Sequence, residues 1–277
     1  MPGSSQGDGS LVSRNELFAG LVLLGFANGI SGRVISSVVE DGIAPALLST
    51  FNISVIVWSA CAIGISFLLR GPVQPVRTFD RVITICVLVA VLMPVAPLSW
   101  LALTGLAVYI MRSSPRSSFL QRGACILLAM TVPMFWGRLL FAVLSDLILR
   151  GDATLVGWLV GTPRLGNAIQ FADGSGYLWI APPCSSLANI SLAILCWVTI
   201  AKALNHPGSV RDVGWVVLAC AAVVAINVTR ISLIGLHPEQ YELIHGPAGL
   251  AVASWMILGV TLGICLLGVR RDLPARA

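Results

Sequence analysis

The sequence predicts an all-α protein that crosses a membrane several times as a polytopic bundle of helices. Only 10% of its 277 residues are charged, whereas 57% are hydrophobic. Soluble domains carry about 25% charged residues, so a soluble enzyme, a coiled coil and a disordered chain are all excluded. The apolar residues also gather in runs close to the length of about 20 residues that spans a bilayer.

Eight apolar runs are candidates for membrane-spanning helices. They cover residues 17–39, 43–69, 82–97, 98–111, 124–149, 186–204, 213–236 and 246–269. The third and fourth runs are short and are separated by Pro94 and Pro97, so we expect a tight hairpin or a re-entrant pair. Residues 1–13 are rich in Ser and Gly and predict a disordered tail. Residues 14–277 then form a single transmembrane domain.

The basic residues predict the orientation of these helices. If the N-terminus is cytoplasmic, twelve of the seventeen Lys and Arg residues fall in loops on the inner side. Cytoplasmic loops are enriched in Lys and Arg, so we expect a plasma-membrane protein with both termini cytoplasmic. The net charge of +5 comes from these scattered residues and indicates no nucleic-acid partner.

In this topology residues 150–185 lie outside the cell, and their pattern is not helical. Residues 167–171 alternate between polar and apolar, 173–176 form a turn signal, and 177–180 favour a strand. We expect a short β-like hairpin or an interfacial loop before the sixth span. Residues 186–269 follow and contain most of the side chains that could take part in a reaction.

Cys184 differs from the other six cysteines in its position. Those six lie inside apolar runs and are typical of small buried hydrophobic residues (Cys61, Cys86, Cys125, Cys196, Cys220 and Cys265). Cys184 instead follows two prolines and opens the sixth helix, where Ser185 or Ser186 can cap the first amide groups. The positive end of a helix dipole lowers a thiol pKa and favours the nucleophilic thiolate. From position alone, packing at a helix start is an equally good interpretation.

Arg230 and His245 are the other two candidates. Arg230 lies within the seventh helix, where a charge costs about 2.5–3.5 kcal/mol at the bilayer centre, and it shares a helix face with Asn227. A functional role is favoured over simple snorkelling to the headgroups. His245 opens the eighth helix and is a weak signal by itself.

The predicted topology brings these three residues to one membrane face. The sixth and eighth helices start there, and the seventh helix ends there. A cysteine nucleophile, a histidine acid/base and an arginine that stabilises charge form a plausible set for acyl transfer.

At these residues the chain resembles the exosortase/archaeosortase family. The resemblance rests on residues 183–186 (PCSS), 227–231 (NVTRI) and 245–249 (HGPAG), in their order and spacing. It implies a membrane thiol protease and transpeptidase, with Cys184, Arg230 and His245 as catalytic residues. It also implies a role in protein sorting: exported proteins that end in a short motif, a transmembrane helix and a basic tail are cleaved at the motif and passed to an acceptor. The family often has Gly where this chain has Ser186.

Other residues have weaker claims to a role. Arg138 and Asp146 lie on the fifth span and could line a polar cavity, help to bind substrate, or pair with another helix. Asn167 could contact the substrate motif or belong to the loop surface. No HExxH-like pair is present on a helix, so we expect neither a metal nor another cofactor.

Two other functions compete with the peptidase. In a small transporter or channel, Arg138 and Arg230 would line an anion path, although no internal repeat supports this. A lipid-linked glycan transferase would use an arginine and a histidine at the outer face. Neither function requires a thiol, so both should tolerate Cys184→Ser.

Overall fold

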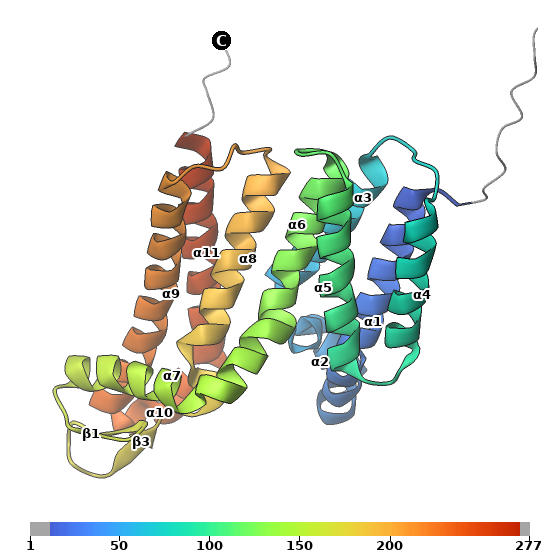
Figure 1. Cartoon of the computed structure of the whole chain (residues 1–277). Helices are drawn as coiled ribbons and strands as arrows, with labels where there is room; N and C mark the ends of the chain where they lie inside the picture. The colour runs from blue at the N-terminus through green and yellow to red at the C-terminus, as the bar shows by residue number, and fades with distance from the viewer. Residues whose placement is uncertain (1–11, 272–277) are drawn as a thin grey trace, which may run out of the picture. The chain divides into compact units, whose positions relative to one another are not determined.

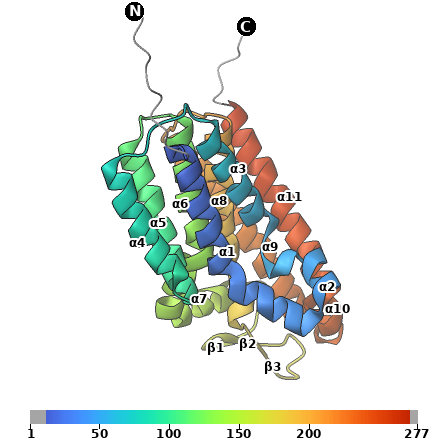
Figure 2. The same cartoon turned by 90° about the vertical axis from the view of Figure 1, so that its right-hand side faces the viewer.

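The computed structural model describes residues 12–271 and is an all-α helical bundle, as the sequence predicts. The chain divides into two compact units, residues 1–131 and 132–277, shown as ribbons in Figures 1 and 2. Five helices in the described part of the chain are long and apolar enough to cross a membrane. The other predicted spans form helices that are shorter or less apolar. The helices of the second unit position the candidate site.

Unit 1 holds the first six α-helices of the described chain and one short 3-10 turn. They are α1 (Arg14–Asp41), α2 (Ile43–Leu48), η1 (Thr50–Asn52), α3 (Val55–Arg70), α4 (Thr78–Leu92), α5 (Ala96–Ser113) and α6 (Phe119–Thr131). Helix α1 packs against α3, α4 and α5, and α6 packs against α3 and α5. The break between α4 and α5 falls at Met93–Val95, beside the prolines of the sequence, and the two helices pack together.

The prediction of one continuous helix over 43–69 was wrong. The chain leaves the helix after Leu48 and re-enters it at Val55. Thr50, Phe51 and Asn52 between them all have positive φ angles near 55°. That conformation is unfavourable for residues other than glycine and interrupts the helical hydrogen bonds.

Helix α1 begins at Arg14, directly after the segment 1–13 that was expected to form a tail. Residues 1–11 lie outside the described residues, but Ser13 is the N-cap of α1. Its hydroxyl accepts a hydrogen bond from the amide of Glu16, and the Glu16 carboxylate accepts one from the amide of Ser13. This reciprocal pair is a capping box, which satisfies two amide groups that a helix start leaves free.

A buried ion pair joins three helices of unit 1. Arg14 Nε lies 3.0 Å from Asp80 Oδ2, and both side chains are fully buried. Tyr109 Oη donates to Asp80 Oδ1 at 2.7 Å, and the Arg14 guanidinium also donates to Gln74 and Ser113. Arg14 therefore links α1 to α4 and α5 inside the unit.

Unit 2 begins with a π-helical turn and continues through a long, bent helix. Its helical elements are η2 (Val132–Trp136), α7 (Gly137–Val160), η3 (Pro182–Cys184), α8 (Ser186–Ala203), α9 (Arg211–Leu236), η4 (Pro238–Gln240), α10 (Tyr241–His245) and α11 (Pro247–Arg271). Helices α8, α9 and α11 pack against one another, and α7 packs against α8 and α9.

Helix α7 differs from the sequence prediction in two respects. Residues 150–160 were expected outside any helix, but α7 continues to Val160 and ends at Gly161, whose left-handed φ of 77° is typical of a glycine C-cap. The predicted span over 124–149 is also not one uninterrupted α-helix. Pro133 cannot donate a helical hydrogen bond and lies in the π-helical turn, and Leu144 leaves helical geometry within α7.

A small antiparallel sheet follows α7. It consists of β1 (Arg164–Leu165), β2 (Ala168–Gln170) and β3 (Tyr177–Trp179) in that order, with Ile169 opposite Leu178. Ile169 packs into a core cluster with residues of α7 and α9. The amide of Ala172 also donates to the carbonyl of Gly235 at 2.9 Å, which ties the loop after β2 to the end of α9. The strands, α10 and the second half of α7 lie at one end of unit 2 (Figure 1).

Candidate functional site

Cys184 lies at the junction between a proline-rich turn and the start of α8. Pro182 and Pro183 begin the short turn η3, and the amide of Cys184 donates to the carbonyl of Ala181 at 2.9 Å. Ser185 is the N-cap of α8, and its hydroxyl accepts from the amide of Leu187 at 3.2 Å. The Cys184 thiol is free and half-buried. It therefore lies on a fixed backbone next to the positive end of a helix.

The His245 imidazole is next to this thiol. Cys184 Sγ lies 4.0 Å from His245 Nε2, although the two residues are 61 positions apart in sequence. His245 is the last residue of α10, and its ring stacks on Tyr241 with centroids 4.8 Å apart and an angle of 12°. The stacking holds the imidazole in place. An imidazole at this position can accept the thiol proton, and such contacts are often long before substrate binds.

Asn227 on α9 holds the cysteine turn from the other side. Its Nδ2 donates to the carbonyl of Cys184 at 2.8 Å and to the hydroxyl of Ser186 at 3.1 Å. Asn227, Ser185 and Ser186 are all buried. Ser186 is thus a hydrogen-bond acceptor in this chain, a role that glycine could not fill.

Asp152 was missed as a site residue because the sequence placed it in an outer loop. It lies on α7 and is buried, and its Oδ2 accepts a hydrogen bond from the amide of Ser186 at 3.0 Å. A carboxylate at a helix N-terminus satisfies a free amide group and interacts favourably with the helix dipole. No local pattern marks this role, because Asp152 precedes Ser186 by 34 residues.

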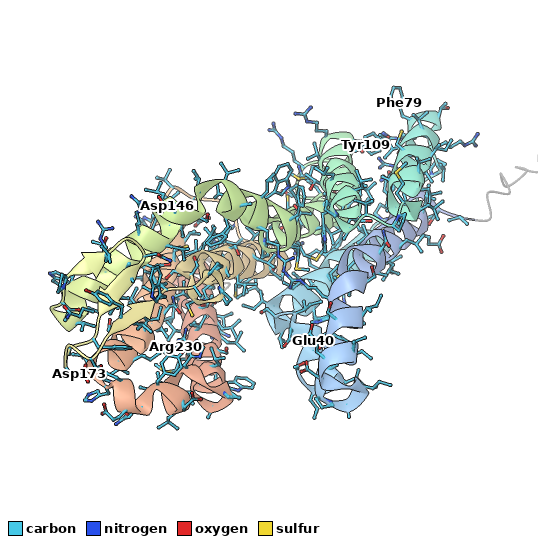
Figure 3. The ribbon with its side chains drawn as sticks, turned by 90° about the horizontal axis from the view of Figure 1, so that it is seen from below. Glu40, Phe79, Tyr109, Asp146, Asp173 and Arg230 are labelled. Carbon is cyan, nitrogen blue, oxygen red and sulfur yellow. The ribbon has the colours of Figure 1, made fainter. Side chains whose placement is uncertain are left out.

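Arg230 lies on α9, three residues after Asn227, and is nine-tenths buried. Within the described structure its Nη1 has no hydrogen-bond partner. The residue borders a cavity of about 470 Å³ that is lined by α9, α10 and α11 and is otherwise mostly apolar. In Figure 3 Arg230 lies among the side chains of unit 2, whereas Asp146 and Asp173 lie at its edge. Arg230 therefore combines a buried, unpaired donor with a position at the edge of this cavity.

Arg138 and Asn167 are not part of this group. Arg138 is exposed near the start of α7, and Asp146 pairs with Arg150 at 2.9 Å on the same helix, with both side chains exposed. Asn167 donates through Nδ2 to the carbonyl of Ile180 at 3.1 Å and so closes the small sheet. In the described part of the chain, neither residue forms a hydrogen bond to Cys184, Arg230 or His245.

The structure brings a thiol, an imidazole and a carboxamide into contact, in Cys184, His245 and Asn227. The Arg230 guanidinium lies three residues from Asn227 on α9 and borders the neighbouring cavity. Among residues 12–271, no group of three or more His, Cys, Asp or Glu side chains could hold a metal ion. No protein-family model, curated protein or solved structure matches this chain. A nucleophile beside a base, with a free cationic donor on the adjacent helix, is suited to acyl transfer.

Proposed function

We propose that this chain is a membrane-embedded cysteine peptidase and transpeptidase of the exosortase type. Its substrates would be exported proteins whose C-terminal sorting signal is cleaved and whose new C-terminus is passed to an acceptor. The observation that carries the proposal is the 4.0 Å contact between Cys184 Sγ and His245 Nε2. The three short motifs at residues 183–186, 227–231 and 245–249 support the same assignment.

The proposed reaction begins with transfer of the Cys184 thiol proton to His245 Nε2. The sulfur then attacks a substrate carbonyl carbon, and the C–S bond forms as the carbonyl oxygen becomes an oxyanion. Arg230 Nη1 donates to that oxyanion, a contribution worth about 10²–10³ in rate for a single donor elsewhere. The C–N bond breaks as His245 returns the proton to the leaving amine, and a thioester remains on Cys184.

The second half of the reaction releases the thioester. Water, or an amine or hydroxyl of the acceptor, attacks the thioester carbonyl while His245 takes the proton of the attacking group. The C–S bond breaks, and the proton passes from His245 to the departing sulfur. Hydrolysis and transfer differ only in the attacking group, so the same side chains serve both.

The proposal includes a topology of eight spans with both termini cytoplasmic. Residues 161–185 and the active site would then face the outer side of the membrane. The excess of basic residues in the proposed inner loops supports this orientation. Within unit 2, α10 and the small sheet lie at the same end, and Cys184 contacts α10 there. This shared position supports an active site on one side of the membrane.

The test is processing of a co-expressed exported protein that carries a C-terminal sorting signal. We expect a shortened product with the wild type and none with Cys184→Ala or Cys184→Ser. His245→Gln should reduce the rate about 10²–10⁴-fold, the usual contribution of a general acid/base. His206→Gln is the matched control, because His206 is a buried histidine of the same unit that pairs with Asp212 instead. Product formation that survives Cys184→Ser would contradict the mechanism and favour a transporter or a glycan transferase.

A further inference from the structure

The cavity beside Arg230 is an apolar groove that runs along two membrane-length helices. It starts at Arg230 and Ile244, next to the reactive end of unit 2, and extends to Ala225 on α9 and Met256 on α11. From Ala248 to Met256 the groove follows α11 for about 12 Å, at about 1.5 Å per helical residue. Ile244 directly precedes His245, so the groove begins beside this histidine and follows α9 and α11 from there.

Small residues line both walls of this groove. Gly249 and Ala253 are four residues apart on α11, and Ala225 and Thr229 are four residues apart on α9. Residues at this spacing share one helix face. Pairs of small residues four apart allow another helix to approach closely within a membrane, where side-chain packing rather than the hydrophobic effect drives association. An acyl chain has no such requirement.

Arg230 provides an independent indication that the groove takes a ligand. Its side chain is nine-tenths buried and borders the groove, yet Nη1 has no partner in the described structure. Among the residues that the structure describes, no acidic side chain lines the groove to neutralise it. A buried donor without an acceptor is unfavourable, so an occupant with a free carbonyl oxygen would stabilise this end of the groove.

We propose that the groove between α9 and α11 binds the transmembrane helix of the substrate's sorting signal. This inference rests on the proposed function and adds the place where the substrate is recognised. In such a signal the cleaved motif directly precedes the helix, and here the groove directly continues from the reactive end. The extended chain before the helix has carbonyl groups that are free to accept from Arg230. The groove begins beside the reactive residues, as the substrate helix begins beside the cleaved motif. Both are apolar, and the small residues leave room for a helix.

Photo-crosslinking tests the occupant in the full-length chain with Cys184→Ala. Benzoylphenylalanine is placed at position 256, inside the groove, or at position 255, which is exposed but does not line it. The probe is a secreted reporter that ends in about 20 apolar residues and a basic tail, without a sorting motif. We expect at least about tenfold more reporter adduct from position 256 than from 255. Equal yields, an adduct of phospholipid mass, or a dimer of this chain at position 256 would each overturn the proposal.

A second experiment fills the groove and measures processing of a reporter with the complete signal. Ala253→Leu adds bulk inside the groove, and Ala251→Leu adds the same bulk on α11 outside it. We expect Ala253→Leu to reduce processing about tenfold relative to Ala251→Leu, at equal membrane abundance. Equal processing by the two variants would overturn the groove while leaving the peptidase intact. Crosslinking at position 256 without processing by the wild type would support the groove and contradict the proposed function.

Discussion

Asn227 connects two groups that determine where the candidate nucleophile lies. A single carboxamide donates to the backbone carbonyl of Cys184 and to the side chain of Ser186. Hydrogen bonds of buried groups contribute little net stability when made, but a buried group that loses its partner costs about 1–3 kcal/mol. The position of the thiol therefore depends on a residue that takes no part in bond making.

Replacement of this carboxamide should loosen the cysteine turn. We expect Asn227→Ala to lower the free energy of unfolding by about 1–3 kcal/mol and to change the alkylation rate of Cys184, measured by peptide mapping after brief iodoacetamide treatment. Asn28→Ala is the matched control, because Asn28 donates to the carbonyl of Val91 at 2.9 Å and to Ser99 at 2.8 Å in unit 1. An equal change in the alkylation of Cys184 in both variants would show that the effect is global.

The site residues differ in how well the sequence could predict them. Arg230 stands out because a charge in an apolar helix is unusual, and Cys184 because it lies outside the apolar runs. His245 is a weak signal alone and gains weight only from the predicted topology, which brings it to the same membrane face. Asn227 follows from its helical spacing to Arg230. Asp152 could not be predicted, since one sequence gives no sign that a carboxylate 34 residues upstream meets the amide of Ser186.

At the scale of the helices, the chain contains a buried ion pair, in unit 1, and an exposed ion pair, on α7. Asp80 is fully buried with Arg14, and its carboxylate also accepts from Tyr109. Asp146 and Arg150 form an ion pair of similar length, but their side chains are 73% and 55% exposed. Exposed pairs contribute about 0–1 kcal/mol, whereas removal of one partner of a buried pair costs about 3–5 kcal/mol.

These two aspartates therefore make a matched test. We expect Asp80→Ala to destabilise the protein by about 3–5 kcal/mol, because it leaves the Arg14 charge buried and unpaired. Asp146→Ala should change stability by less than about 1 kcal/mol. Thermal unfolding in detergent checks both. Similar midpoints for the two variants would show that Arg14 finds another partner or reaches solvent.

The turn between β2 and β3 should respond to acid. Hydrogen bonds from Ser175, from its hydroxyl and its amide, lower the pKa of Asp173 below its ordinary value of 3.8. A carboxylate with a lowered pKa in the folded state stabilises the turn at neutral pH, and this contribution is lost as the pH falls below 3.8. We expect hydrogen exchange at the Ser175 amide, corrected for its intrinsic rate, to rise at low pH.

Asp173→Ala provides the comparison for this pH dependence. The variant should show the faster exchange at neutral pH and no further rise as the pH is lowered. A rise of the same size in both proteins would assign the acid response to another group.

The sequence predicted which segments form helices better than it predicted where those helices begin, break and end. Apolar runs identify α1, α8, α9 and α11, because a run of membrane length leaves little alternative to a helix. The break over Thr50, Phe51 and Asn52 was missed because hydropathy does not report backbone angles. The end of α7 was also missed, because the apolar residues after Gly151 had been assigned to a loop.

Across the whole molecule, the proposed topology makes a labelling prediction. Leu165 in β1 and Val210 before α9 are both exposed, and the eight-span arrangement puts them on opposite sides of the membrane. In a Cys86→Ser, Cys184→Ala background, we expect an impermeant maleimide to label Leu165→Cys in spheroplasts. Val210→Cys should react only after lysis. Labelling of both positions from one side would contradict an odd number of crossings between them.

The contacts that Cys184 makes with Asn227 and His245 form in a fixed order during synthesis of the chain. The thiol is made 43 residues before the carboxamide of Asn227 and 61 residues before the imidazole of His245. A nascent chain that has just released α8 from the ribosome therefore carries the thiol without either neighbour. Because α10 is synthesised after α8 and α9, translation arrested before residue 245 leaves Cys184 without the His245 imidazole. Under the proposed function, the order of the chain would therefore delay activation of the thiol until α10 has been made.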